Sequence, residues 1–187
     1  VQYLTGTVQI SKPASPNPVT LDSPASEVMT DLRKLHAAVI APNITMEVAN
    51  NYMMHRGVRT LLVMNDDNSL AGIITATDIL GEKPMRFIQE RGIKHSEILV
   101  QDMMTPLEKL EAIPLEEVTH ARVGNIVASL RESDRLHALV IDENTIGLSR
   151  ICGIFSWTQI EKQLGTVIPP NNVAKSFAEI ESTLIAS

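Results

Sequence analysis

The sequence is poor in aromatic residues, has a single cysteine, and contains no long run of apolar residues. Aromatic side chains make up 3% of its 187 residues, so the stacking platforms that bind single-stranded nucleic acid are scarce. The 22 acidic residues outnumber the 16 basic ones, and the resulting net charge of −6 repels a phosphate backbone. Both features argue against DNA or RNA as a partner.

The single cysteine and the short apolar stretches indicate the cellular compartment of the protein. Cys152 lies in the apolar string ICGIF, where we expect an inert buried thiol. A chain with one cysteine has no internal disulfide, which fits a reducing compartment. The longest apolar stretches fall far short of the roughly 20 residues that a membrane-spanning helix needs. We therefore expect a cytoplasmic chain with no membrane partner.

Motifs for metal binding and catalysis are absent from the sequence. The five histidines lie far apart, with no pair at the ligand spacing of a helix and no cysteine partner, so no zinc site is expected. Calcium loops, Walker loops and nucleophile motifs are absent too. We expect no metal, no required cofactor and no enzymatic activity.

One supersecondary unit occurs twice, and this repeat is the most informative pattern in the sequence. In the first copy, an apolar run at 37–41 precedes an amphipathic helix at 44–57. Two β-rich runs, at 59–65 and 70–75, and a helix start at 76–80 follow. The strings VMTD, LLVMND and GIITATDIL are echoed in the second copy by MMTP, ALVIDE and GIFSWTQIE. The order strand, helix, strand, strand, helix is therefore expected in both halves.

Changes of composition suggest where the parts of the chain begin and end. Residues 1–26 end in a segment rich in proline and serine, which predicts an arm or linker that runs over the surface and starts no core. The two repeats are assigned to 27–92 and 93–166. After the breaker PPNN, apolar residues at helical spacing predict a C-terminal helix within 167–187.

On these motifs the chain resembles the cystathionine beta-synthase (CBS) domain family. The strings VQDMMTP, RGVRTLLVMND and GIITATD carry the resemblance, which covers roughly residues 26–165. It implies an α/β fold in which two β-α-β-β-α repeats pair about a pseudo-twofold axis, with facing sheets and outer helices. It also implies a stand-alone module that binds a ligand in clefts between the repeats and forms a homodimer.

The string GIITATD carries the first candidate site. A strand that ends at Thr75 and turns into a helix presents N–H groups and a hydroxyl to a phosphate. Asp78 can accept hydrogen bonds from two ribose hydroxyls, and the resemblance assigns it this role. The alternative is that Thr75 only caps the helix and Asp78 is a favourable first-turn acid. The resemblance also places Arg59 on a nucleotide phosphate. Lys83 is either a further phosphate contact or a solvated loop lysine.

The second copy departs from this motif. Ser156 keeps the hydroxyl, but Gln159 replaces the acid, and a neutral amide is the poorer acceptor for two ribose hydroxyls. Arg135 and His137 flank the position that corresponds to Arg59, so a cation can still reach the second cleft. We expect a weakened second site and a better-formed site around Arg59, Thr75 and Asp78.

Two functions stay open at this point. In the first, a regulatory sensor binds AMP, ADP, ATP or S-adenosylmethionine between the repeats and signals to a regulated protein that the sequence does not identify. In the second, the chain is a structural dimerisation or interaction module whose degenerate clefts are unoccupied. Asp78 and Arg59 favour the first function, and Gln159 favours the second. The candidate ligand-binding residues are Arg59, Thr75, Asp78, Lys83, Ser156, Gln159 and His137.

Overall fold

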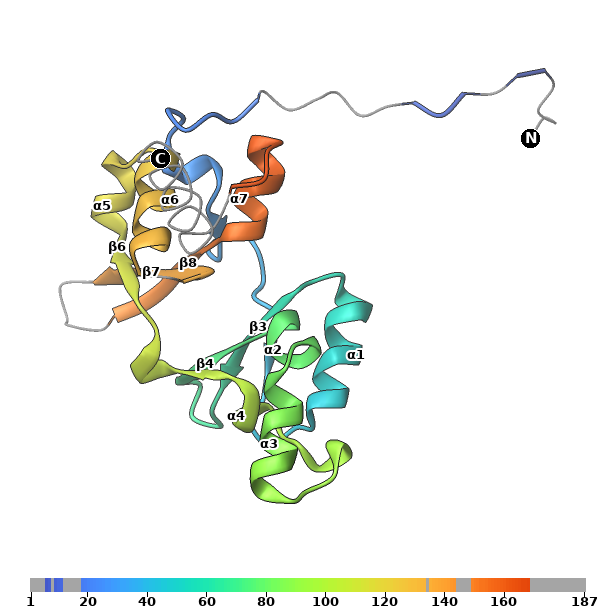
Figure 1. Ribbon diagram of the computed structural model, residues 1–187. Coiled ribbons are helices and arrows are strands. Elements are labelled where there is room, and N and C mark those ends of the chain that lie inside the picture. Colours follow the sequence, from blue (N-terminus) through green and yellow to red (C-terminus); the bar gives the residue numbers. More distant parts are fainter. Residues whose placement is uncertain (1–5, 8, 12–17, 134, 144–148, 169–187) are drawn as a thin grey trace, which may run out of the picture.

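The computed structural model describes residues 6–7, 9–11, 18–133, 135–143 and 149–168 and has two α/β lobes (Figure 1). Each lobe contains a four-stranded sheet, with strand order β2-β3-β4-β5 in one and β1-β8-β7-β6 in the other. The predicted α/β class is thereby confirmed. The strands are β1 (Thr30–Asp31), β2 (Val39–Ile40), β3 (Thr60–Met64), β4 (Leu70–Thr75), β5 (Thr105–Pro106), β6 (Ala112–Pro114), β7 (His137–Glu143) and β8 (Ser149–Ser156). The helices are α1 (Met46–Arg56), α2 (Ala76–Leu80), α3 (Lys83–Arg91), α4 (Val100–Met103), α5 (Leu115–His120), α6 (Val123–Glu132) and α7 (Trp157–Leu164), with short 3-10 turns at Ala25–Glu27, His95–Glu97 and Leu107–Lys109.

Local sequence explains where the first long helix starts and stops. The hydroxyl of Thr45 accepts a hydrogen bond from the amide of Val48, which caps the start of α1. Gly57 ends the helix with a φ of 64°, in the left-handed region that favours glycine. The chain then enters β3, and β3 pairs with β4 as an antiparallel hairpin. These elements agree with the sequence predictions.

The two sheets face each other, and the helices lie outside them. In Figure 1, α5, α6 and α7 lie on the outer side of β7 and β8, and α1 to α4 gather around the other sheet. Leu62 on β3, Ile73 on β4 and Leu139 on β7 are buried together between the sheets. Each lobe also has its own core between sheet and helices. The facing sheets place the strand ends of both repeats around a shared interface.

An edge strand of each sheet comes from the other half of the chain. In β1, Thr30 pairs with Ile154 of β8, and in β5, Thr105 pairs with Ile73 of β4. The strings VMTD and MMTP, which correspond in the sequence, thus add strands to the sheets of the opposite repeats. The proposed domain boundaries at 26/27 and 92/93 stay predictions. Each repeat contributes one strand to the sheet of the other.

A glycine lies at each point where an exchanged strand, β1 or β5, packs on the sheet of the other repeat. A Cβ atom on Gly72 of β4 would collide with the backbone carbonyl oxygen of Thr105 and approach the Sδ atom of Met104. A Cβ atom on Gly153 of β8 would meet the thioether of Met29. Both glycines are therefore needed for close approach of the exchanged strand.

The segment before the first repeat enters the core, which corrects one expectation. Residues 11–26 were predicted to start no core, but the side chain of Ala25 is fully buried and packs with Val118, Val123 and Ile126. The amide of Ala25 also donates to the carbonyl of Ala121 at 2.9 Å. The prediction failed because proline and serine content reports the local chain conformation and not its tertiary contacts. The predicted C-terminal helix lies outside the described residues, which end at Ile168.

Candidate ligand-binding cavities between the repeats

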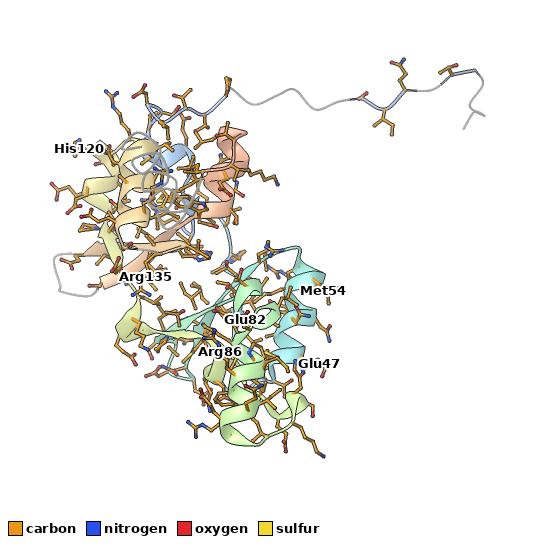
Figure 2. All side chains as sticks on the ribbon, viewed as in Figure 1. Glu47, Met54, Glu82, Arg86, His120 and Arg135 are labelled. Atoms are coloured by element: carbon orange, nitrogen blue, oxygen red, sulfur yellow. The ribbon has the colours of Figure 1, made fainter. Side chains whose placement is uncertain are left out.

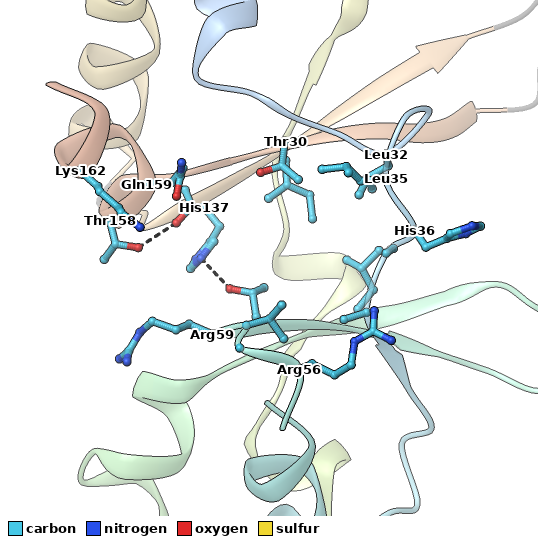
Figure 3. Close-up of a pocket in the computed structure, with 18 residues that line it drawn as sticks. Thr30, Leu32, Leu35, His36, Arg56, Arg59, His137, Thr158, Gln159 and Lys162 are labelled. Carbon is cyan, nitrogen blue, oxygen red and sulfur yellow. Dashed lines mark hydrogen bonds between the residues drawn. The ribbon is translucent and has the colours of Figure 1, made fainter. Parts of the chain in front are cut away.

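The larger cavity, of about 470 Å³, takes its walls from both repeats (Figure 3). Gln159, Thr158 and Lys162 enter from α7, while Arg56 and Arg59 enter from the opposite repeat. Its apolar wall is formed by Leu32, Leu35, Ala37, Ala38, Val58, Leu62 and Ile154. A cavity with one apolar wall and a few polar groups is typical of small-molecule sites, which span roughly 300–1,000 Å³.

The permanently charged side chains that line the larger cavity are all positive. Arg56, Arg59 and Lys162 line it, and two histidines, His36 and His137, join them. Among the described residues, no aspartate or glutamate lines this cavity. Arg59 follows the helix stop at position 57 and precedes β3, so its backbone position is set by two regular elements. A cluster of cations without a lining acid suits an anionic ligand.

Hydroxyl and amide groups of the second repeat lie in the same cavity. Ser156 is the last residue of β8, and its hydroxyl lies 3.0 Å from that of Thr158. The amide nitrogen of Gln159 lies 3.4 Å from the side-chain oxygen of Gln163, one helical turn further along α7. These groups can donate to or accept from a ligand, but none of them supplies a negative charge.

His137 lies at the boundary between the larger and the smaller cavity and lines both. Its Nε2 atom is 3.2 Å from the hydroxyl of Thr60, which joins the two repeats. Burial lowers the pKa of His137 below its ordinary value, and the negative charge of Asp78 acts in the opposite direction. His137 is therefore biased towards the neutral form, in which one ring nitrogen donates and the other accepts.

The smaller cavity, of about 180 Å³, contains the acid of the first repeat. Thr75 caps α2: its hydroxyl accepts from the amide of Asp78, and Oδ2 of Asp78 accepts from the amide and the hydroxyl of Thr75, each at 2.9 Å. Lys83 reaches the other carboxylate oxygen, Oδ1, at 2.5 Å and also donates to the carbonyl of Met103. Asp78 is thus a capping residue and one half of an ion pair.

Arg135 enters the smaller cavity from the second repeat. It lines this cavity together with Thr105 and Leu136. Its Nε atom is buried and has no hydrogen-bond partner among the described residues. Figure 2 places Arg135 on the side of its lobe that faces the other repeat. A buried guanidinium N–H without an acceptor is destabilising, so an acceptor for this group would stabilise the fold.

The structure divides the sequence candidates between the two cavities. Arg59, Ser156 and Gln159 line the larger one, Thr75 and Asp78 line the smaller one, His137 lines both, and Lys83 contacts Asp78. The expected grouping of Arg59 with Thr75 and Asp78 is therefore not observed. Arg135 also lies in the cavity of the first motif and not in that of the second.

Two cations of the larger cavity, Arg56 and Lys162, were not predicted from the sequence. Each stands three positions from a residue that had been identified, Arg59 and Gln159 respectively. For Lys162 this spacing was a usable signal, because residues three apart share one face of a helix. For Arg56 no such signal existed, since Gly57 breaks the helix between it and Arg59.

The described part of the chain has neither a cluster of metal ligands nor a membrane-spanning helix. In the described part of the chain, no three His, Cys, Asp or Glu side chains cluster closely enough to hold a metal ion. Over the same residues, no helix has the length and apolar character for crossing a bilayer. Burial raises the pKa of the Cys152 thiol, and the side chain lies in a lobe core.

Two α/β repeats that face each other across shared cavities define the chain as a tandem-repeat module. Residues 25–84 match the model of the CBS domain family. This segment of the chain is therefore assigned to the CBS domain family, and the fold of the chain is that of a CBS pair. The resemblance found in the sequence is thereby confirmed.

Solved structures with this fold include three that bear on the comparison. An uncharacterized conserved protein from Pyrococcus horikoshii is 23% identical, with 77% of this chain and 93% of that chain covered and a TM-score of 0.54. CBSX2 of Arabidopsis thaliana in complex with AMP is 20% identical, with coverages of 75% and 94% and a TM-score of 0.51. The CBS domain of a bacterial CNNM/CorC family Mg²⁺ transporter is 17% identical, with 80% of each chain covered and a TM-score of 0.51. At these identities the likeness is one of fold. No curated protein matches the sequence.

Proposed function

We propose that this chain is a regulatory module that senses an adenosine phosphate in the larger cavity between its repeats. The observation that carries the proposal is the pairing, in one cavity of about 470 Å³, of an apolar wall with Arg56, Arg59 and Lys162. An adenine ring can pack on apolar side chains, and phosphate oxygens can accept from guanidinium and ammonium groups. CBSX2, which has the same fold, is known in complex with AMP.

The charges of the cavity favour some of the candidate ligands over others. AMP, ADP and ATP carry negative phosphates, whereas S-adenosylmethionine carries a positive sulfonium. The described lining has three permanent cations and no acid, so electrostatics favour the phosphates. The acceptor for ribose hydroxyls is the neutral amide of Gln159, which lowers the contribution of the ribose.

Signalling would follow from the shared walls of the cavity. A ligand that contacts Arg59 of one repeat and Gln159 of the other is sensitive to their separation, because it binds best at one relative position. Binding then shifts the population of repeat arrangements, and a regulated protein can read this shift. The proposal includes no catalytic step.

The structural alternative rests on a separate observation. The apolar side chains of Val48 and Met54 on α1, Leu80 on α2 and Met85 on α3 are exposed. Exposed apolar groups on neighbouring helices are typical of a protein interface, so we propose a homodimer through these helices. In this alternative, dimerisation is the working property and the cavities bind nothing.

The test compares AMP with adenosine on three forms of the chain by titration calorimetry. Arg59→Ala should weaken AMP by a factor on the order of ten to a hundred, since a charge-assisted contact contributes about 1.5–3 kcal/mol. Adenosine has no phosphate, so its affinity should stay nearly unchanged. The matched control is Arg86→Ala, which removes an exposed arginine of α3 that pairs with Glu82, the residue before this helix.

Each outcome separates the two functions. A selective loss of AMP affinity in Arg59→Ala, absent in Arg86→Ala, supports the sensor. Equal losses of affinity for adenosine and AMP would show that Arg59 does not contact the phosphate. Absence of binding to the unaltered chain, with a dimer in sedimentation that Met54→Glu splits, would instead support the structural module.

A further inference from the structure

The guanidinium group of Arg56 lies over the aromatic ring of Tyr52. Arg56 is the last residue of α1, and Tyr52 stands one helical turn earlier. The Cζ atom of Arg56 is 5.8 Å from the centre of the ring, within the roughly 6 Å over which a ring face attracts a cation. Long side chains of a helix lean towards its N-terminus, which brings residues four apart into contact. The contact therefore follows from the geometry of α1.

Tyr52 is the fixed member of this pair. Its side chain is partly buried and packs against the core of the lobe that contains β3 and β4. Arg56 is exposed, and within the described part of the chain it makes no salt bridge and no side-chain hydrogen bond. An exposed arginine without such partners samples many rotamers. The ring is thus the contact that restricts the position of this guanidinium group.

The same guanidinium group belongs to the larger cavity. Arg56 and Arg59 both line it, and Figure 3 shows their side chains diverging from the turn that joins α1 to β3. A guanidinium group that stacks on a ring uses its face, and its N–H donors stay at the edge of the plane. Arg56 can therefore contact Tyr52 and a phosphate oxygen at the same time.

An aromatic ring orients a cation without cancelling its charge. Lys83 provides the contrast, because its ammonium group pairs with the carboxylate of Asp78 and the two charges compensate each other. The ring of Tyr52 brings no such charge, so Arg56 keeps its attraction for an anion. A side chain that is ordered before binding also loses less rotamer freedom when the ligand arrives.

We propose that Tyr52 is a positioning residue of the larger cavity, which holds Arg56 where it contacts a phosphate group of the ligand. This role rests on the proposed function, because it lies within the same site. Tyr52 is not among the described residues that line the cavity, so its effect on binding passes through Arg56. The effect is therefore confined to ligands that carry a phosphate.

The first experiment measures the affinities for AMP and adenosine by titration calorimetry. Tyr52→Leu keeps an apolar side chain but removes the ring, and it should weaken AMP by roughly two- to fivefold, the value of an exposed cation–π contact. Tyr52→Phe keeps the ring and should retain the affinity. Adenosine affinity should be the same in both variants. A loss of AMP affinity in Tyr52→Phe as large as that in Tyr52→Leu would contradict a role of the ring.

The chain contains a matched control for the loss of the ring. On α3, the Cζ atom of Arg91 lies 5.6 Å from the centre of the Phe87 ring, at the same spacing along a helix. Arg91 is not among the described residues that line the larger cavity. Phe87→Leu should therefore leave AMP affinity unchanged. A loss equal to that of Tyr52→Leu would show that removing such a ring acts through the stability of the lobe.

A double-mutant cycle tests whether Tyr52 acts through Arg56. Arg56→Gln should weaken AMP by roughly tenfold or more, because a charge-assisted contact is lost. Tyr52→Leu should then cause no further loss in the Arg56→Gln background. Losses that add would contradict the positioning role. Tighter AMP binding in Tyr52→Leu would also overturn it, because the ring would then hold Arg56 away from the ligand.

A measurement without ligand separates this role from the sensor function. The Nε–H signal of Arg56 in NMR spectra should show a ring-current shift in the unaltered chain and in Tyr52→Phe, and the shift should vanish in Tyr52→Leu. If Tyr52→Leu does not fold, Tyr52→Met removes the ring in its place. Absence of AMP binding by the unaltered chain would overturn the sensor and the role of Tyr52 together. AMP binding with the ring-current shift present, but with no loss in Tyr52→Leu, would overturn the role of Tyr52 alone.

Discussion

The hydroxyl of Thr60 lies 3.2 Å from the Nε2 atom of His137, and this contact joins equivalent strand starts of the two repeats. Thr60 begins β3 and His137 begins β7. Both residues line the larger cavity, and His137 also lines the smaller one. The hydrogen bond therefore stands in the wall that separates the two candidate sites.

The lowered pKa of His137 predicts a pH dependence of stability. Because the folded chain disfavours the protonated imidazole, the unfolded chain binds more protons between the folded pKa and the ordinary value of 6.5. The free energy of unfolding should thus fall as the pH drops through 6.5 towards the folded pKa, and no further loss from this group should occur below it. In His137→Asn this part of the pH dependence should disappear.

Urea denaturation at about pH 7.5 and about pH 5.5 measures the effect. The control is His120→Asn, at the exposed end of α5 (Figure 2), which should keep the pH dependence of the unaltered chain. A His137→Asn variant as sensitive to acid as the unaltered chain would show that other groups cause the loss.

Asp78→Ala should destabilise the fold by about 1–2 kcal/mol, a cost in the range of helix-capping interactions, because it removes the Asp78 half of the capping box with Thr75. The alanine removes the acceptor for the amide and hydroxyl of Thr75 and leaves Lys83 without its carboxylate. Chemical denaturation gives the free energy of unfolding. Asp66→Ala, in the exposed turn between β3 and β4, is the control and should cost much less. Equal costs at the two positions would mean that the bonds of the Asp78 carboxylate to Thr75 and Lys83 contribute little.

Gln159→Asp should make AMP binding depend more strongly on the ribose. The carboxylate can accept from both ribose hydroxyls, whereas the amide accepts more weakly. The ratio of the affinities for AMP and for 2′,3′-dideoxy-AMP should rise by roughly three- to tenfold, as measured by calorimetry. Gln101→Asp, on the exposed surface of α4, should leave the ratio unchanged. An unchanged ratio in Gln159→Asp would place the ribose away from α7.

Gly72→Ala should cost more stability than Gly153→Ala. The added methyl at Gly72 meets the backbone carbonyl of Thr105, which cannot move without shifting β5, whereas the methyl at Gly153 meets the flexible thioether of Met29. Overpacking of this kind costs about 1–3 kcal/mol, and we expect the upper end at Gly72 and the lower end at Gly153. Chemical denaturation of both variants provides the comparison. A larger cost at Gly153 would contradict the packing argument.

The local elements of the fold could be predicted from the sequence because their signals are local. The helix stop at Gly57 and the apolar runs of β3 and β4 depend on neighbouring residues alone. The exchange of β1 and β5 could not be predicted in this way. Each of these strands has two residues, too few for a periodic pattern, and their pairing is decided by the opposite repeat.

For the candidate sites, the ligand-binding residue types could be predicted from the sequence. Their distribution between the two cavities could not. The amide of Ala76 donates to the carbonyl of Arg59 at 2.8 Å. The backbone at Arg59 therefore lies next to the backbone that follows Thr75. Their side chains nevertheless enter different cavities. Successive residues of a strand point to opposite faces, so adjacency in the backbone does not bring side chains together.

The exchange of edge strands means that the repeated unit of the sequence and the folding unit of the chain differ. A duplicated sequence usually duplicates a unit that can fold by itself, but here neither copy is complete alone. A fragment that stopped after the first repeat would leave the edge of β4 without β5 and would carry β1 without β8 to pair with. The repeated unit is therefore smaller than the unit of folding, and a single copy would need a second identical chain to complete its sheet.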